Sequence, residues 1–166
     1  MGMKILVATD GSLGSKAALR FADRLAGSLR DAELVVITVG ALRHDLFLSR
    51  PENPAGLALQ PELEREEREL ASRTLQAAER ELKHERAHAR FRFVQPRRMA
   101  PVAETIAQEA DREKADLIVV GTDRYGAFAS WALGSVSARL LQIARWPVTV
   151  VHVGKRAART AERRLA

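Results

Sequence analysis

The 166-residue chain contains no cysteine, and this absence removes several classes of function at once. Disulfide bonds, thiolate metal sites and a cysteine nucleophile are all excluded. No apolar run is longer than a strand, whereas a membrane-spanning helix needs about 20 consecutive apolar residues. The chain also opens without the pattern of a cleavable leader. We therefore expect a cytoplasmic protein with no membrane partner.

Aromatic residues are scarce, at 5% of the chain, although hydrophobic residues make up 46% of it. The core must therefore consist mainly of Ala, Val, Leu and Ile, which is typical of parallel strands buried on both faces. A chain of this length forms one domain and buries roughly two thirds of the surface that its unfolded state exposes. We see no internal repeat and no second domain.

The net charge of +6 is unevenly distributed. Residues 154–166 hold five basic residues and one acidic residue, which leaves a charge of only +2 on the rest of the chain. A basic tail on a nearly neutral domain is typical of a solvated chain end rather than of a nucleic-acid site. We expect residues 1–153 to form the domain, residues 154–166 to form a mobile tail, and nucleic acid not to be a partner.

Five short apolar runs predict β-strands. Four are rich in β-branched residues, as in strands covered on both faces, and one alternates Phe with Arg, as in an edge strand with one wet face. Apolar residues recurring every three or four positions predict a helix in each gap between the runs. The runs cover residues 4–8, 34–39, 90–95, 116–121 and 147–153, and the helical patterns cover residues 18–29, 63–82, 102–110 and 136–144. This alternation predicts an α/β fold with right-handed crossovers and a parallel sheet.

Residues 41–61 interrupt the pattern. The segment contains Pro51, Pro54, Gly56 and Pro61 and shows no clear periodicity, so it is predicted to be a long loop. Loops of this length in compact domains often close over a site or contact a partner. We expect a lid or an arm of a dimer here.

Two loops are candidate binding elements, because ligands of open parallel sheets sit beyond the carboxyl ends of strands where the strand order reverses. The first loop, residues 8–12, reads Ala-Thr-Asp-Gly-Ser, and the second runs from Gly121 to Gly134 and Ser135. The last two residues open a predicted helix, whose free N–H groups suit a phosphate; alternatively, Ser135 only caps that helix. Asp10 also has two readings, since it either caps the first helix or offers its carboxylate to a ligand.

Four separated segments carry a resemblance to a known family: ILVATDGS at 5–12, DLIVVGT at 116–122, GSVSARLL at 134–141 and WPVTVVHV at 146–153. In this order they resemble the universal stress protein family over nearly the whole chain. The resemblance implies a doubly wound five-stranded sheet of order 3-2-1-4-5 with helices on both faces, a role in stress survival, and in many members ATP binding. It also implies a homodimer, which we expect to form through the last strand, Pro147–Val153, because an apolar edge strand must be paired or covered.

Nucleotide-binding members of that family share a pattern of Gly, two residues, Gly, nine residues, Gly, and Ser or Thr. The spacing is intact here, but Arg124 occupies the position of the second glycine. Its side chain either obstructs the close approach of backbone N–H groups to the phosphates or places a guanidinium on them, while Gly126 restores some freedom to the loop. The resemblance implies these nucleotide-binding residues: Ala8, Thr9, Asp10, Val39, Gly121, Thr122, Arg124, Gly126, Gly134, Ser135 and Val136.

Two other motifs match known sites only superficially. His84 to His88 reads HExxH, the zinc motif of a helix, but charged neighbours on both sides indicate a solvated helix end, and no third ligand is evident. Gly11 to Lys16 has two residues between its glycines where a P-loop has four, and it lacks the Lys-Ser or Lys-Thr ending. We expect no metal site in the protein itself.

The sequence therefore predicts a stress-response regulator that binds an adenine nucleotide, ATP with Mg²⁺ as its companion ion, between Asp10 and the Gly121–Ser135 loop. The alternative is a dimeric interaction module of the same fold that binds no nucleotide because of Arg124. An enzyme is not expected, since only Asp10 and Asp123 lie within reach of the predicted pocket and no nucleophile and base accompany them. Any ATP hydrolysis is expected to be weak and incidental.

Overall fold

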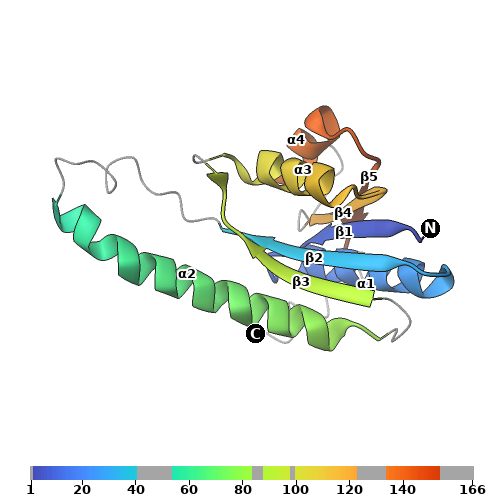
Figure 1. Cartoon of the computed structure of the whole chain (residues 1–166). Helices are drawn as coiled ribbons and strands as arrows, with labels where there is room; N and C mark the ends of the chain where they lie inside the picture. The colour runs from blue at the N-terminus through green and yellow to red at the C-terminus, as the bar shows by residue number, and fades with distance from the viewer. Residues whose placement is uncertain (1, 41–53, 84–87, 98–99, 123–133, 154–166) are drawn as a thin grey trace.

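The computed structural model describes residues 2–40, 54–83, 88–97, 100–122 and 134–153 (Figure 1). Within these residues, strands and helices alternate along the chain as the hydrophobic periodicity predicts. No helix among them is both long enough and apolar enough to cross a membrane. The elements are β1 (Lys4–Ala8), α1 (Leu13–Ser28), β2 (Glu33–Val39), α2 (Pro54–Glu81), β3 (His88–Val94), α3 (Val102–Glu113), β4 (Leu117–Thr122), α4 (Ser135–Ile143) and β5 (Val148–His152).

The five strands form one parallel sheet of order β3-β2-β1-β4-β5, which confirms the predicted fold. Helices α1 and α2 cover one face and α3 and α4 cover the other (Figure 1). The central strand β1 pairs on one side with β2, its neighbour in sequence, and on the other with β4. The strand order therefore reverses at β1, between two crossovers that lie on opposite faces of the sheet.

The core has two layers because successive side chains of a strand point to opposite faces of the sheet. Ile5 and Val7 of β1 are fully buried beneath α1, and Leu6 between them is fully buried on the side of α3 and α4. Strands β2 and β4 contribute Val, Leu and Ile to both layers in the same way. These continuous apolar runs explain why the strands were predictable from the sequence.

Gly121, near the end of β4, lies against the backbone of α1. A Cβ atom built on this glycine would overlap the backbone of Gly14 and Ser15 in the first turn of the helix. The absence of a side chain therefore allows α1 to approach β4 directly. The first glycine of the sequence motif thus has a packing role in addition to any contact with a ligand.

Helix α2 corrects the prediction of a loop over residues 41–61. The helix already begins at Pro54 and includes Pro61, while residues 41–53 lie outside the described residues. Pro54 fits the first helical position, where its missing N–H costs nothing. The strong helix formers between the two prolines outweigh the interruption at Pro61. The helix has 28 residues, and its first turns extend past the carboxyl edge of the sheet (Figure 1).

Strand β3 occupies an edge, as predicted, and its arginines lie on a partly exposed face, where they pair with acidic residues of neighbouring elements. Arg92 ion-pairs with Glu109 and Glu113 of α3, and Arg90 ion-pairs with Glu33 and Glu113. Burial raises the pKa of Glu113, but the hydrogen bond from Arg90 and the charges of both arginines lower it by more than burial raises it. The net pKa therefore lies below its ordinary value. These pairs hold the edge strand onto α3.

The HExxH segment does not form one helix, because α2 ends at Glu81 and His88 is the first residue of β3. Residues 84–87 lie outside the described part of the chain. A strand residue does not share the i, i+4 helical face that the zinc motif requires. Among the described residues, no group of three or more His, Asp or Glu side chains is placed to hold a metal ion.

The contact at Gly121 generates a stability prediction. We expect Gly121→Ala to lower the free energy of unfolding by about 3 kcal/mol, because the added methyl group meets backbone atoms that cannot rotate away. Gly134→Ala is the matched control, since a Cβ there lies 3.7 Å from the nearest atom of the described residues, Thr122 Oγ1, and the φ angle of −57° suits alanine. Urea unfolding of both variants and wild type measures the difference, and equal stabilities would contradict the packing role.

Candidate functional site

A cavity of about 350 Å³ lies at the carboxyl ends of β1 and β4, where the strand order reverses. The first turns of α1 and α4 border it. Nine of the eleven predicted site residues line it; Arg124 and Gly126 fall in residues 123–133, outside the described residues. These nine residues are Ala8, Thr9, Asp10, Val39, Gly121, Thr122, Gly134, Ser135 and Val136.

Six lining residues were missed by sequence reasoning: Ser12, Ser15, Val102, Ile106, Val120 and Ser137. The serines follow from the helix starts, because a helix that begins at a cavity presents its first-turn side chains there. Val102 and Ile106 belong to the first turns of α3, whose position over the end of β4 no local pattern reveals. They add apolar side chains to the lining of the cavity.

The turn at Asp10 is held by a hydrogen bond between the Asp10 side chain and a backbone N–H of the same turn. The Ser12 N–H donates to Asp10 Oδ1 at 3.0 Å, and Gly11 between them has a φ of +81°, a conformation that favours glycine. Ser12, rather than Asp10, caps α1 by accepting a hydrogen bond from the Ser15 N–H. The reading of Asp10 as the helix cap is therefore wrong, and its carboxylate stays at the cavity.

Asp10 is ionised at neutral pH. Partial burial raises the pKa of its carboxyl group, but hydrogen bonds from Ser12 and Ser15 lower it by more than burial raises it. The net pKa therefore lies below the ordinary value. An ionised carboxylate only accepts hydrogen bonds. Asp10 is therefore suited to hydroxyl or amino groups of a ligand and not to a phosphate.

Helix α4 begins at the cavity without a side-chain cap. The cap position is Gly134, which has no side chain, and Ser135 is the first residue of the helix, so the reading of Ser135 as the cap is wrong. The amides of the first turn have no acceptor within the helix. With the positive end of the helix dipole, they form a site that favours an anion.

Thr122 contributes a buried polar atom without a partner. The residue is only 5% exposed, and its Oγ1 makes no hydrogen bond with any described residue. By contrast, the neighbouring hydroxyl of Thr9 is paired with Ser15 Oγ at 3.1 Å. A buried hydroxyl without a partner is costly, and this one lies beside the start of α4, 3.7 Å from the point that a Gly134 Cβ would occupy.

The walls of the cavity divide by chemistry. Val39, Val102 and Ile106 provide apolar surface, while hydroxyl groups come from the end of β1, the start of α1 and β4, and free amides come from the start of α4. Asp10 is the one charged side chain among the described lining residues. Positive potential along these walls therefore comes from backbone N–H groups and helix dipoles.

Comparisons with known proteins agree with this architecture. A model of the universal stress protein family matches residues 1–152. A universal stress protein solved in complex with cAMP is 25% identical, with a TM-score of 0.57 over 91% of this chain and 97% of that one. A family member from Burkholderia pseudomallei is 27% identical, with a TM-score of 0.59 over 89% and 94%.

The protein from Archaeoglobus fulgidus, solved in complex with dAMP, is 23% identical, with a TM-score of 0.54 over 90% of this chain and 97% of that one. At this identity the likeness supports the fold alone. No curated protein sequence matches the chain. Because the family model spans nearly the entire described fold, the chain belongs to the universal stress protein family.

Proposed function

We propose that this protein is a cytoplasmic stress-response regulator that binds an adenine nucleotide, ATP, in the cavity between β1 and β4. The observation that carries the proposal is the unpartnered buried hydroxyl of Thr122 beside the uncapped start of α4. Together they provide one hydroxyl and several amide donors for a phosphate. The cAMP complex of a 25% identical family member supports an adenine nucleotide as the ligand class.

The division of the walls assigns each part of the nucleotide. The apolar surface of Val39, Val102 and Ile106 receives the flat base, and the Asp10 carboxylate accepts hydrogen bonds from the ribose hydroxyls. The phosphates lie at the first turn of α4. Mg²⁺ accompanies the phosphates and is held mainly by them, because Asp10 is the one carboxylate in the described walls. Because the described lining residues include no activated nucleophile or base, we propose that the nucleotide acts as a bound regulator and not as a substrate.

Thr122→Val separates a ligand contact from a structural role. In the free protein we expect unfolding stability equal to wild type or higher by up to about 1 kcal/mol, because valine removes a buried hydroxyl that has no partner among the described residues. ATP affinity is expected to fall about tenfold, which corresponds to ~1.4 kcal/mol. Urea unfolding and calorimetric titration with ATP measure the two effects.

Thr105→Val is the matched control, since Thr105 is equally buried but its hydroxyl donates to the Pro101 carbonyl at 3.1 Å, outside the cavity. It should lower stability by about 1 kcal/mol and leave ATP affinity unchanged. A Thr122→Val protein that loses stability but keeps its ATP affinity would reject the role assigned to this hydroxyl.

Arg124 decides between the two readings of the motif loop. The described walls contain no basic side chain that would neutralise the negative charge of the phosphates. A guanidinium from the loop would therefore stabilise the bound phosphates. We therefore expect Arg124→Gly to weaken ATP binding about tenfold, or ~1.4 kcal/mol, and to leave adenosine binding nearly unchanged. Calorimetric titration of both proteins with both ligands measures this.

The other outcomes are equally informative. Tighter ATP binding by Arg124→Gly would show that the arginine obstructs the loop. If neither protein binds ATP or adenosine, the nucleotide proposal is wrong, and the protein is an interaction module of the same fold.

We also propose that the protein forms a homodimer through β5, the edge opposite β3. Residues Val148 to Val151 are only partly covered, and no described strand pairs with their outer side. An apolar edge of this kind needs a partner. We expect light scattering at micromolar concentration to give twice the chain mass, and Val150→Lys to give a monomer.

Ala89→Lys, on the opposite edge strand β3, is the control and should remain dimeric. Circular dichroism melts establish that both variants fold. A wild-type monomer, or a dimer that survives Val150→Lys but not Ala89→Lys, would place any self-association elsewhere.

A further inference from the structure

A second candidate binding region surrounds β3, the edge strand that lies two strands from β1 in the sheet. Strand β3 is the last strand of the sheet at this edge, and among the described residues nothing pairs with its outer side. Hollows lie on both faces of this one strand. One of about 400 Å³ lies toward α2, and one of about 480 Å³ lies toward α3.

The outer backbone of β3 is free to pair with another strand. The Val94 carbonyl accepts a hydrogen bond from the Gly40 N–H at the end of β2, so the backbone of Val94 points inward. Backbone groups of successive strand residues alternate in direction. Ala89, Phe91 and Phe93 therefore turn their N–H and C=O groups outward, in a row that can receive an added strand.

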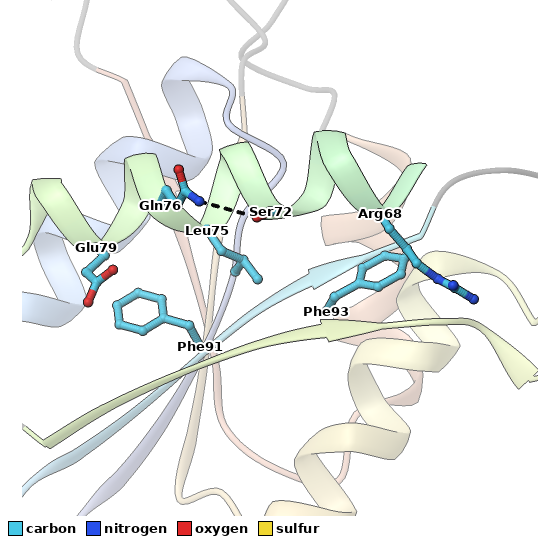
Figure 2. Close-up of a pocket in the computed structure, with 7 residues that line it drawn as sticks. All are labelled: Arg68, Ser72, Leu75, Gln76, Glu79, Phe91 and Phe93. Carbon is cyan, nitrogen blue, oxygen red and sulfur yellow. Dashed lines mark hydrogen bonds between the residues drawn. The ribbon is translucent and has the colours of Figure 1, made fainter. Parts of the chain in front are cut away.

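The hollow on the α2 side is an apolar groove. Figure 2 shows Phe91 and Phe93 rising from β3 toward α2, with Leu75 descending from the helix between them. Polar residues of α2 also line it, among them Ser72 and the oppositely charged Arg68 and Glu79. Because this groove lies beside the row of outward amides, alternate side chains of an added strand would enter it.

The hollow on the α3 side is basic. Arg92, Arg97 and Arg112 line it against one acidic residue, Glu109. Glu109 is paired with Arg92 and Arg112, Arg92 is also paired with Glu113, and Arg97 makes no ion pair with any described residue. Three arginines against these two glutamates leave this face of the strand with an excess of one positive charge, at Arg97, and the remaining side chains of an added strand would lie along it.

We propose that β3 binds an extended segment of a partner protein that alternates apolar with acidic residues. The strand pairs with the outer amides of Ala89, Phe91 and Phe93, its apolar side chains enter the groove beneath α2, and its carboxylates face Arg92, Arg97 and Arg112. A second copy of β3 fits less well, because its own arginines would lie beside Arg90 and Arg92.

The experiment uses a fluorescein-labelled seven-residue peptide with blocked ends that alternates Glu and Val, matching the seven residues of β3. Fluorescence anisotropy measures its affinity for the full chain. The control is a matched peptide that alternates Lys and Val. We expect the Glu and Val peptide to bind at least tenfold more tightly than this control, and its binding to weaken as the salt concentration rises. Methylation of alternate peptide amides should abolish binding in one of the two possible registers, since strand addition requires those donors.

Protein variants test each half of the site. Ser72→Trp fills the groove from an exposed position on α2 and should weaken binding at least tenfold, while Ser28→Trp, at the exposed end of α1, should have no effect. Arg97→Glu should weaken binding about fivefold, while Arg145→Glu, exposed after α4, should leave it unchanged.

Several results would overturn the proposal. They are equal affinity for the Glu and Lys peptides, binding that survives amide methylation in both registers, no loss with Ser72→Trp, or no binding of any peptide. Self-association that is lost in Ala89→Lys would assign this edge to a second copy instead. None of these readouts depends on nucleotide, so failure here leaves the proposed function of the cavity unaffected.

Discussion

The direct contact between Gly121 and the first turn of α1 is the constraint on which the rest of the structure depends. Because β4 has no side chain at this point, the helix lies on the strand at backbone distance. That approach brings Ser12 and Ser15 to the end of β4, where they face Thr122 and the start of α4. With a longer distance here, the two helix starts would not border one cavity. The packing of the fold and the polar wall of the site thus follow from the same missing side chain.

The site that results is built mainly from backbone and hydroxyl groups. Its one charged side chain among the described residues is Asp10, which is negative. Under the proposed function, anion recognition relies on amides held rigidly by a helix, which need no side-chain ordering when a ligand binds. This differs from the α3 side of β3, where the positive charge is carried by long arginine side chains. The two regions are thus suited to different partners: a small phosphate-bearing ligand, and an extended acidic segment.

Most of the fold could be predicted from the sequence, because the signals were strong and local. Runs such as Leu34 to Val39 are buried on both faces and permit little other than a central strand. The prediction failed where local signals compete with chain context. Pro61 marks a loop in most sequences, yet here it lies inside α2. Nor could the alternating pattern reveal that the partly exposed Arg92 pairs with two glutamates of α3 that are distant in sequence.

The candidate site was predicted in outline through the family resemblance, which implied nine residues that line the cavity. The spacing could not assign the helix caps, since whether Ser12 or Asp10 caps α1 depends on where the first helical turn begins. Nor could it reveal Val102 and Ile106, which reach the cavity only because α3 packs over the end of β4. The missing partner of Thr122 is likewise a property of the packed structure, with no counterpart in the sequence.

The pairing of β1 with β4 has a consequence for how the protein folds. The hydrogen bond from the Lys4 N–H to Asp116 joins residues 112 positions apart, whereas β1 and β2 are joined by a single helical crossover. Closing so long a segment carries a large entropic cost and slows folding. Both walls of the cavity meet only when this pairing has formed. A ligand that requires both walls therefore stabilises only the complete fold. A chain that is still emerging from the ribosome and lacks β4 has no site for this ligand.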